Sequence, residues 1–370
     1  MSAICASFSS PIYAQELAKN TASVEKISVV GSATNLSITA EEIEQYQASD
    51  LADIFRHSPS VSVGGSVGVA QKIYIRGVED SLLNITVDGA QQTSTLFHHI
   101  GRVTIDPDLL QQIDVQAGAG EATSGPGAIG GSIRFKTKDA QDLLNQGEQF
   151  GGRVKASYFS NDGTRLSTSV YGKLSDTWGV LGYFSTVDRE NMEDGDGDTI
   201  YGTAADQDMM FIKASGELAD NHHLSVSIEK RDEEGDFSAR PNWAVQEGDA
   251  LYPSEAERET YVANYIFSHN NLLYLEATAY KTESSFNGGR FAWLADIDTY
   301  GLDIRNTSII DEHKFVYGVD YRNDEVSSGS AAGAKENSEQ GSVLGVYAQG
   351  YSDITPQLLL SYGVRFDSYK

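Results

Sequence analysis

The chain has 370 residues, of which 53 are acidic and 27 basic, and its formal net charge of −26 at pH 7 would repel polyphosphates, which excludes nucleic-acid binding. The single cysteine, Cys5, lies before the expected mature N-terminus, so disulfides, metal-thiolate sites and cysteine catalysis are excluded as well. No run of about 18 apolar residues occurs, which excludes a conventional transmembrane helix but not a transmembrane β-barrel, whose strands alternate apolar and polar residues.

The chain opens with a segment that is typical of exported proteins. Residues 1–14, MSAICASFSSPIYA, are small and apolar and end in an A-x-A-like sequence, so we interpret them as the remnant of a secretory signal peptide. Residues 15–38 are polar and expected to be flexible, apart from a β-prone run, VEKISVVG, at residues 24–31. On local sequence alone this run is equally a peptide that adds as a strand to a partner's sheet and the first strand of the domain that follows.

Two short helices are predicted next, over residues 40–46 and 50–55. Thr39 and Glu42 have the spacing of a capping box, which marks the start of the first helix. Pro59 ends the second helix, because the residue before a proline is driven out of the helical conformation.

A compact α+β unit is predicted over residues 72–138, where β-type runs alternate with glycine-rich turns. Its glycine-rich run at residues 118–131 lacks the Gly-Lys-Ser/Thr ending of a phosphate-binding loop, and no helix obviously follows it. We therefore interpret these glycines as tight turns and places of close backbone approach. The expected elements are strands at residues 72–76, 84–88, 113–116 and 131–137 and a helix-like piece at residues 106–112.

Beyond residue 150 the sequence becomes a series of predicted strands. Several alternate cleanly, as where Leu224, Val226 and Ile228 are separated by polar or charged residues. One face of each strand is thus apolar and the other polar, which is typical of an antiparallel wall with lipid on one side and water on the other. The eleven strands are expected at residues 153–160, 165–174, 177–187, 209–217, 222–230, 260–268, 272–281, 301–310, 313–322, 342–350 and 357–369.

The connections between these strands indicate what kind of wall they form. After a short first loop, tight turns alternate with long loops, so that all long loops fall at one end of the strands. This sorting is typical of an outer-membrane barrel, and a soluble β-sheet binding protein has no reason for it. A passive porin would not need residues 72–138, because a filled lumen does not conduct. Since an unclosed sheet of eleven strands would leave two exposed edges, we expect the chain to lack the C-terminal strands of its barrel.

Together these features resemble a TonB-dependent outer-membrane receptor. The resemblance implies a mainly β fold, with an α+β plug domain at residues 39–145 inside an antiparallel transmembrane β-barrel, of which residues 151–370 are the first half. The motifs that carry it are DLADIFRHSPSVSV, KIYIRGV, ITVDGAQQ and IDPDLLQQIDVQAGAGEATSGPGAIGGSIRFKTK, similar to successive plug segments of the family, and GVRFDSY, similar to a mid-barrel strand.

The resemblance also implies roles for individual residues. It makes the run at residues 24–31 the TonB box, formed by Glu25, Lys26, Ile27, Ser28, Val29 and Val30. Structural roles in the plug fall on Arg76, Gly77, Asp88, Gly89, Gly130 and Gly131. We expect Arg76 and Asp88 to hold plug strands to the barrel wall through ion pairs. The chain departs from the family at residues 116–119, where Arg-Gly-Pro is usual, and at Ser124, where a tyrosine is common, which leaves the plug contacts of this turn open.

The function that this resemblance implies is energy-coupled import across the outer membrane of a Gram-negative bacterium. A solute binds at the extracellular mouth, the TonB box then pairs with TonB by β-addition, and the inner-membrane energising complex drives remodelling of the plug. The expected partners are TonB, outer-membrane lipid and the solute. Because no bond in the solute changes and no convergent set of titratable groups stands out, we expect neither an enzyme nor a permanent cofactor.

The expected solute follows from the segment at the plug apex. In haem receptors of this class a plug-apex histidine is an axial ligand, and His99 lies at about the matching offset before Asp106. Residues 138–154 also resemble the passage from plug to barrel in haem receptors. We therefore predict haem or a haem protein as the ligand, bound by His99 with His98 and Phe97 beside it and with His99 on the iron. A ferric siderophore is the alternative ligand. The structural alternative is that the two histidines form a solvent-exposed pair without a binding role.

Overall fold

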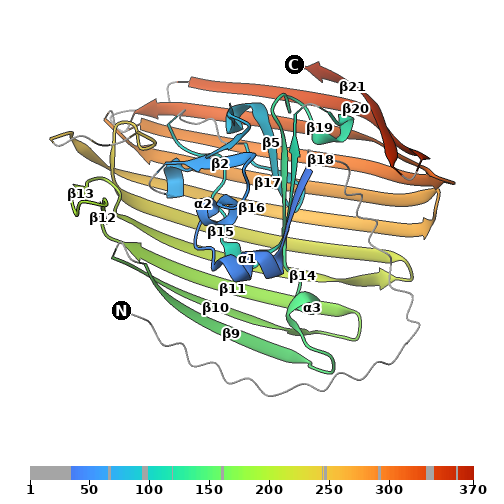
Figure 1. The fold of residues 1–370 in the computed structure, drawn as a ribbon, viewed down its shortest axis with the longest axis horizontal. Helices are drawn as coiled ribbons and strands as arrows, with labels where there is room; N and C mark the ends of the chain where they lie inside the picture. Colours follow the sequence, from blue (N-terminus) through green and yellow to red (C-terminus); the bar gives the residue numbers. More distant parts are fainter. Residues whose placement is uncertain are drawn as a thin grey trace.

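The computed structural model of the protein describes residues 35–65, 68–93, 99–118, 120–159, 162–243, 245, 248–290, 293–330, 337–355 and 357–370. In these residues a plug of short strands and helices lies against one face of a long, curved antiparallel sheet, here called the inner face of the wall (Figure 1). No helix in the described ranges has both the length and the apolar character needed to cross a membrane.

The plug contains two small sheets. In the larger, with strand order β1-β7-β8-β5-β6, strands β5 and β8 are parallel and the other pairs antiparallel, and the smaller has the order β2-β3-β4. The elements are β1 (Asn35–Thr39), α1 (Ala40–Tyr46), α2 (Leu51–Phe55), β2 (Val61–Gly64), η1 (Gly68–Ala70), β3 (Lys72–Ile75), β4 (Val78–Glu79), η2 (Asp80–Leu82), β5 (Leu83–Val87), β6 (Ala90–Gln91), η3 (Pro107–Leu109), β7 (Leu110–Ala117), η4 (Ala122–Ser124), β8 (Gly131–Thr137) and α3 (Ala140–Leu143), where η marks a 3-10 turn.

The plug has an apolar core of its own, which explains why this unit folds as a body distinct from the wall. Phe55 of α2 meets Phe135 of β8 edge to face with a ring-centroid distance of 6.4 Å, and isoleucines from β3, β5 and β7 surround them. The capping box predicted for α1 is confirmed, because the Glu42 carboxylate accepts a hydrogen bond of 2.8 Å from the backbone N–H of Thr39 while the Thr39 hydroxyl accepts one from Glu42.

Two expectations for the plug need correction. The boundary expected at residue 39 cuts through β1, which pairs with β7 and buries Ile38 in the plug core, so residues 35–38 belong to the plug sheet. The helix-like piece expected at residues 106–112 is only the 3-10 turn η3, and β7 starts directly after it at Leu110. Pairing with β1 on one side and β8 on the other outweighs the local helix preference of this segment.

All eleven predicted wall strands are present, and they pair with their sequence neighbours in order from β9 to β21. Between β11 and β14 a small hairpin, β12 (Met192–Glu193) with β13 (Thr199–Ile200), stands at the long-loop end (Figure 1). The wall strands are β9 (Phe150–Phe159), β10 (Gly163–Lys173), β11 (Trp178–Arg189), β14 (Ala205–Ala219), β15 (His222–Ser238), β16 (Leu251–Asn270), β17 (Leu273–Gly288), β18 (Trp293–Ile310), β19 (His313–Ser330), β20 (Asn337–Thr355) and β21 (Leu358–Tyr369).

Several wall strands continue well beyond the predicted limits at the long-loop end. β15 runs to Ser238 although its apolar alternation stops near residue 230, and β16 starts at Leu251 although the prediction began at residue 260. The extensions carry exposed charged side chains such as Glu234 where the outward face would otherwise be apolar. The alternation used for the prediction therefore ends before the backbone pairing does.

Burial in the wall is inverted relative to a water-soluble protein. In β15 the apolar Val226 and Ile228 face outward and are 42% and 40% exposed, whereas Glu229 faces the plug and is 8% exposed. A soluble protein hides its apolar residues from water, but the outward face of a transmembrane barrel meets lipid. The alternation predicted from sequence is thus confirmed, with its apolar side turned away from the plug.

Candidate functional site

The Arg76-Gly77 and Asp88-Gly89 dipeptides form the turns of the plug hairpins β3–β4 and β5–β6. All four residues have positive φ, of 49°, 80°, 48° and 86° in chain order. Two central residues with positive φ match a type I′ turn, whose twist suits a two-residue hairpin and which favours glycine in its second position. In the motifs KIYIRGV and ITVDGAQQ, the Arg-Gly and Asp-Gly pairs therefore serve to turn the backbone.

Asp88 also joins the plug to the wall, as expected. Its carboxylate lies 3.2 Å from Nζ of Lys213 on β14 and accepts a 2.9 Å hydrogen bond from the backbone N–H of Thr137. Its carbonyl oxygen accepts a 3.0 Å hydrogen bond from Nδ2 of Asn264 on β16. Arg76 differs from the expectation, because its side chain is exposed and has no ion-pair partner within the described ranges.

Gly130 and Gly131 stand where the chain comes too close to its neighbours for a side chain. A Cβ on Gly131, whose φ is 127°, would lie 2.0 Å from the carbonyl oxygen of Gln116, and a Cβ on Gly130 would lie 2.5 Å from Cγ1 of Val78. These contacts agree with the prediction that glycines in the closing motif allow close backbone approach.

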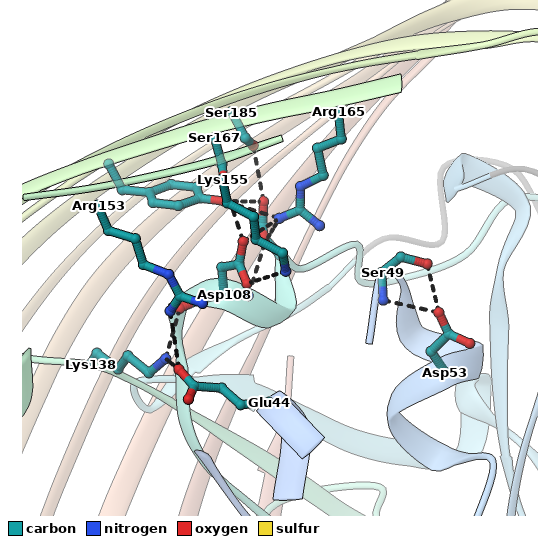
Figure 2. A network of polar contacts seen from close by, with 12 residues as sticks. Glu44, Ser49, Asp53, Asp108, Lys138, Arg153, Lys155, Arg165, Ser167 and Ser185 are labelled. Carbon is teal, nitrogen blue, oxygen red and sulfur yellow. Dashed lines mark hydrogen bonds and ion pairs between the residues drawn. The ribbon is translucent and has the colours of Figure 1, made fainter. Parts of the chain in front are cut away.

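A cluster of charges fixes the closing motif of the plug to the first strands of the wall (Figure 2). Arg165 of β10 forms a buried ion pair with Asp106 and lies 3.3 Å from Oδ2 of Asp108. The hydroxyl groups of Tyr183 and Ser185 on β11 donate hydrogen bonds of 2.5 Å and 2.9 Å to Asp106. The Asp106 carboxylate is thus both paired and hydrogen-bonded, which a charge needs when folding removes it from water.

Asp108 extends this cluster to a further strand. Lys155 of β9 donates a 2.9 Å hydrogen bond to its Oδ1, and Ser167 of β10 donates one of 3.2 Å to its Oδ2. Burial favours the neutral carboxyl group, but the charges of Arg165 and Lys155 outweigh it and hold the pKa of Asp108 below its usual range. The group is therefore an anion at neutral pH and keeps its ion pairs.

The apex of the plug is anchored separately, in a second apolar cluster at the long-loop end. Val69 and Ile100 pack there with Phe237 of β15 and Phe286 of β17. The backbone N–H of Val69 also donates a 2.7 Å hydrogen bond to the buried carboxylate of Glu233. These contacts hold the residue that precedes Ile100 at the long-loop end of the molecule.

That residue is His99, the predicted ligand-binding histidine. It is 8% exposed, its Nδ1 lies 2.8 Å from Oδ1 of Asn242, and its ring meets Trp243 edge to face at a centroid distance of 5.7 Å. When Nδ1 carries the proton, it donates this hydrogen bond to the Asn242 amide oxygen, which fixes the plane of the ring. Metal-ligating histidines are commonly held in this way, by a hydrogen bond at one ring nitrogen. The alternative of a solvent-exposed histidine pair does not describe His99.

The residues that hold His99 come from the loop between β15 and β16, which the sequence did not single out. Asn242 and Trp243 follow Pro241 in a tight turn, closed by a 2.9 Å hydrogen bond from the N–H of Trp243 to the carbonyl oxygen of Arg240. A proline followed by asparagine is favoured at the two central positions of a type I turn, so the turn itself was predictable. Its contact with a residue more than a hundred positions earlier was not.

Other predicted residues lie outside the described ranges, namely His98, Phe97 and the TonB box. Within the described residues, no group of three or more His, Cys, Asp or Glu side chains is placed to hold a metal ion. Of the residues predicted to bind the ligand, His99 is thus the one that the structure describes.

Comparisons with known proteins bear on the class of protein. The family profile of the TonB-dependent receptor plug domain matches residues 25–132. The heme transporter BhuA of Brucella ovis is 31% identical over 343 residues, which cover 89% of this chain and 51% of that protein. The heme/hemopexin utilization protein C of Haemophilus influenzae (strain 86-028NP) is 26% identical over 380 residues, covering 87% of this chain and 53% of that protein. The chain spans about half the length of the curated relatives it matches.

Solved structures show the same fold. The FrpB iron transporter from Neisseria meningitidis (F3-3 variant) superposes with a TM-score of 0.83 at 24% identity, over 91% of this chain and 58% of that one. A double mutant of the Serratia marcescens hemophore receptor HasR, in complex with its hemophore HasA and heme, has a TM-score of 0.76 at 22% identity, over 91% and 52% of the two chains. The chain thus resembles the TonB-dependent receptors in the sequence of its plug, and its plug and wall share the fold of these solved transporter and receptor structures.

Proposed function

We propose that this protein is an outer-membrane receptor of a Gram-negative bacterium that imports haem with energy supplied through TonB. The observation that carries the proposal is His99, buried at the extracellular end of the plug with its Nδ1 fixed by Asn242. Imidazole is a natural axial ligand of haem iron. Two similar proteins, known as a heme transporter and a heme/hemopexin utilization protein, support the same solute.

In this account the solute is cargo, and the chain supplies binding and gating. Haem reaches the apex between the long loops, and the imidazole of His99 binds its iron. Glu25 to Val30 then pair with TonB as an added strand, and pulling on this segment remodels the plug. The charge cluster around Asp106 joins the plug to the wall, so a plug that leaves the wall must break these ion pairs. The bonds of the solute do not change, so no catalytic residue is involved.

Import can be tested by growth on haem. A Gram-negative host without a haem receptor of its own receives the full-length receptor and is given haemin as its iron source. We expect growth with the wild type and little growth with His99→Ala, because the iron loses its protein ligand. His269→Ala, at the tight-turn end of β16, is the control and should behave as the wild type. Growth on a ferric siderophore but not on haemin would overturn the proposal in favour of siderophore import.

Coupling to TonB is tested by deleting residues 24–31 and measuring binding and uptake separately. Binding of haemin to cells should persist, because the apex is untouched, whereas accumulation inside the cells should stop. The same deletion in a host without TonB should cause no further loss. Normal uptake by the deletion variant would show that Glu25 to Val30 are not the TonB box.

A further inference from the structure

The turn over residues 240–243 does more than hold His99. Its first and last residues stand side by side, with the guanidinium carbon of Arg240 4.4 Å from the ring centroid of Trp243. Asn242 points from the same turn to His99. One tight turn therefore carries a cation, an aromatic face and the residue that orients the histidine.

Trp243 remains 55% exposed although its ring touches both Arg240 and His99. It belongs to the loop between β15 and β16, so its exposure is not explained by contact of a strand with lipid. An exposed indole with a cation beside it is a surface on which a flat π-system can stack. The position next to His99 places such a ligand within reach of the imidazole.

The charge of the molecule narrows the class of possible ligands further. The protein carries a formal net charge of −26, so an anionic ligand is repelled by most of its surface. Arg240 supplies a positive charge at the candidate site, and a guanidinium pairs with a carboxylate through two parallel hydrogen bonds. A flat ring for Trp243, a metal for His99 and a carboxylate for Arg240 are combined in a metalloporphyrin with acid side chains.

We propose that Arg240 and Trp243 form a second part of the ligand site, in which Trp243 stacks on the porphyrin macrocycle and Arg240 pairs with one of its carboxylates. This inference rests on the proposed function, since it assumes that His99 binds the iron of the same molecule. It adds a specificity determinant: the turn selects for the acid groups and the flat ring, and His99 for the metal.

The test compares two probes, haemin and haemin dimethyl ester, which lacks the free carboxylates. The full-length receptor in detergent is titrated with each probe, and Kd is read from the Soret band. Arg240→Gln should raise the Kd for haemin about tenfold, as expected for the loss of a charge-assisted pair, and leave the Kd for the ester unchanged. Trp243→Ala should raise both Kd values about three- to tenfold, and Trp243→Phe should restore part of the loss.

A matched control is Arg189→Gln, because Arg189 stacks on Phe159 with a distance of 5.1 Å at the same end of the wall. It should leave both Kd values unchanged. At saturation the Soret position of Arg240→Gln should equal that of the wild type, since His99 is intact. If the wild type binds haemin and neither Arg240→Gln nor Trp243→Ala changes either Kd, this inference is wrong while the proposed function stands. If the wild type binds no haemin, the proposed function itself fails.

Discussion

Arg165 is a cation that folding removes from water and places against carboxylates of the plug. Its neighbours Asp106 and Asp108 come from a segment of the chain more than fifty positions earlier, so the ion pairs join two parts that could otherwise separate. A buried pair adds little net stability over an apolar pair, but removing one partner leaves an uncompensated charge. The cluster therefore acts mainly as a device that specifies where the closing motif sits.

Removing the charge of Asp106 should consequently be costly. For Asp106→Asn we expect the free energy of unfolding of the plug to fall by up to about 3 kcal/mol, because the buried Arg165 loses its main ion pair and keeps only the 3.3 Å contact with Asp108. The measurement is denaturant unfolding of the receptor in detergent. Asp114→Asn on the exposed face of β7 is the control, with an expected change below about 1 kcal/mol. Equal effects of the two variants would show that the Asp106 pair is unimportant for the plug.

Acid should weaken the same cluster through Asp108. Because the pKa of Asp108 is lowered in the folded protein, its contribution to stability is complete above the ordinary pKa of about 3.9 and is lost as pH falls through the lowered value. The difference in unfolding free energy between wild type and Asp108→Asn should therefore stay constant from pH 7 to about pH 5 and shrink below about pH 4. A difference that grows on acidification would contradict this assignment.

At the level of elements, much of the plug was predictable because its signals are local. The capping box at Thr39 and Glu42 marks α1, and the predicted strand at residues 131–137 is β8. The prediction of a helix-like piece at residues 106–112 was wrong, because pairing with two partner strands fixes the conformation of β7 more strongly than the preference of its own residues does. The predicted lengths of several wall strands were too short for a related reason. Backbone pairing continues in β15 after its apolar alternation has ended.

The turn before β8 allows a test of whether close backbone approach requires a glycine. Gly131→Ala should destabilise the plug by more than about 2 kcal/mol, because it adds a Cβ where the Gln116 carbonyl leaves no space and φ is positive. Gly127→Ala, which also has positive φ but no atom within 4 Å of the added Cβ, should cost only about 1 kcal/mol. Thermal unfolding of both variants measures the difference. If Gly131→Ala is as stable as Gly127→Ala, close approach is not the reason for this glycine.

Over the whole molecule, the inverted burial of the wall and its sorted loops are the features that the sequence revealed best, because each repeats in strand after strand. The candidate ligand site was only half predictable. His99 could be named from its offset in the plug motif, whereas the contacts of Asn242 and Trp243 with it, and of Arg240 with Trp243, form only in the folded molecule. Contacts between distant segments leave no periodic signal along the chain.

The outward apolar face makes a prediction about insertion into lipid. Ile228→Arg should lower the stability of the receptor in bilayers by up to about 2–4 kcal/mol, the cost of a charge on the lipid face of a barrel strand. Glu234→Arg, on the same face of β15 but in its charged extension, should have little effect. Folding titrations in lipid vesicles compare the two. A tolerated Ile228→Arg would contradict the assignment of the outward face to the membrane.

The most direct test of the central claim is a Soret titration of the purified full-length receptor with haemin. We expect the wild type to shift the Soret band on binding, His99→Ala to lose this shift and His269→Ala to retain it. An unchanged haemin spectrum in the presence of the wild type, or a shift that survives in His99→Ala, would contradict the claim that His99 is the plug's ligand to haem iron.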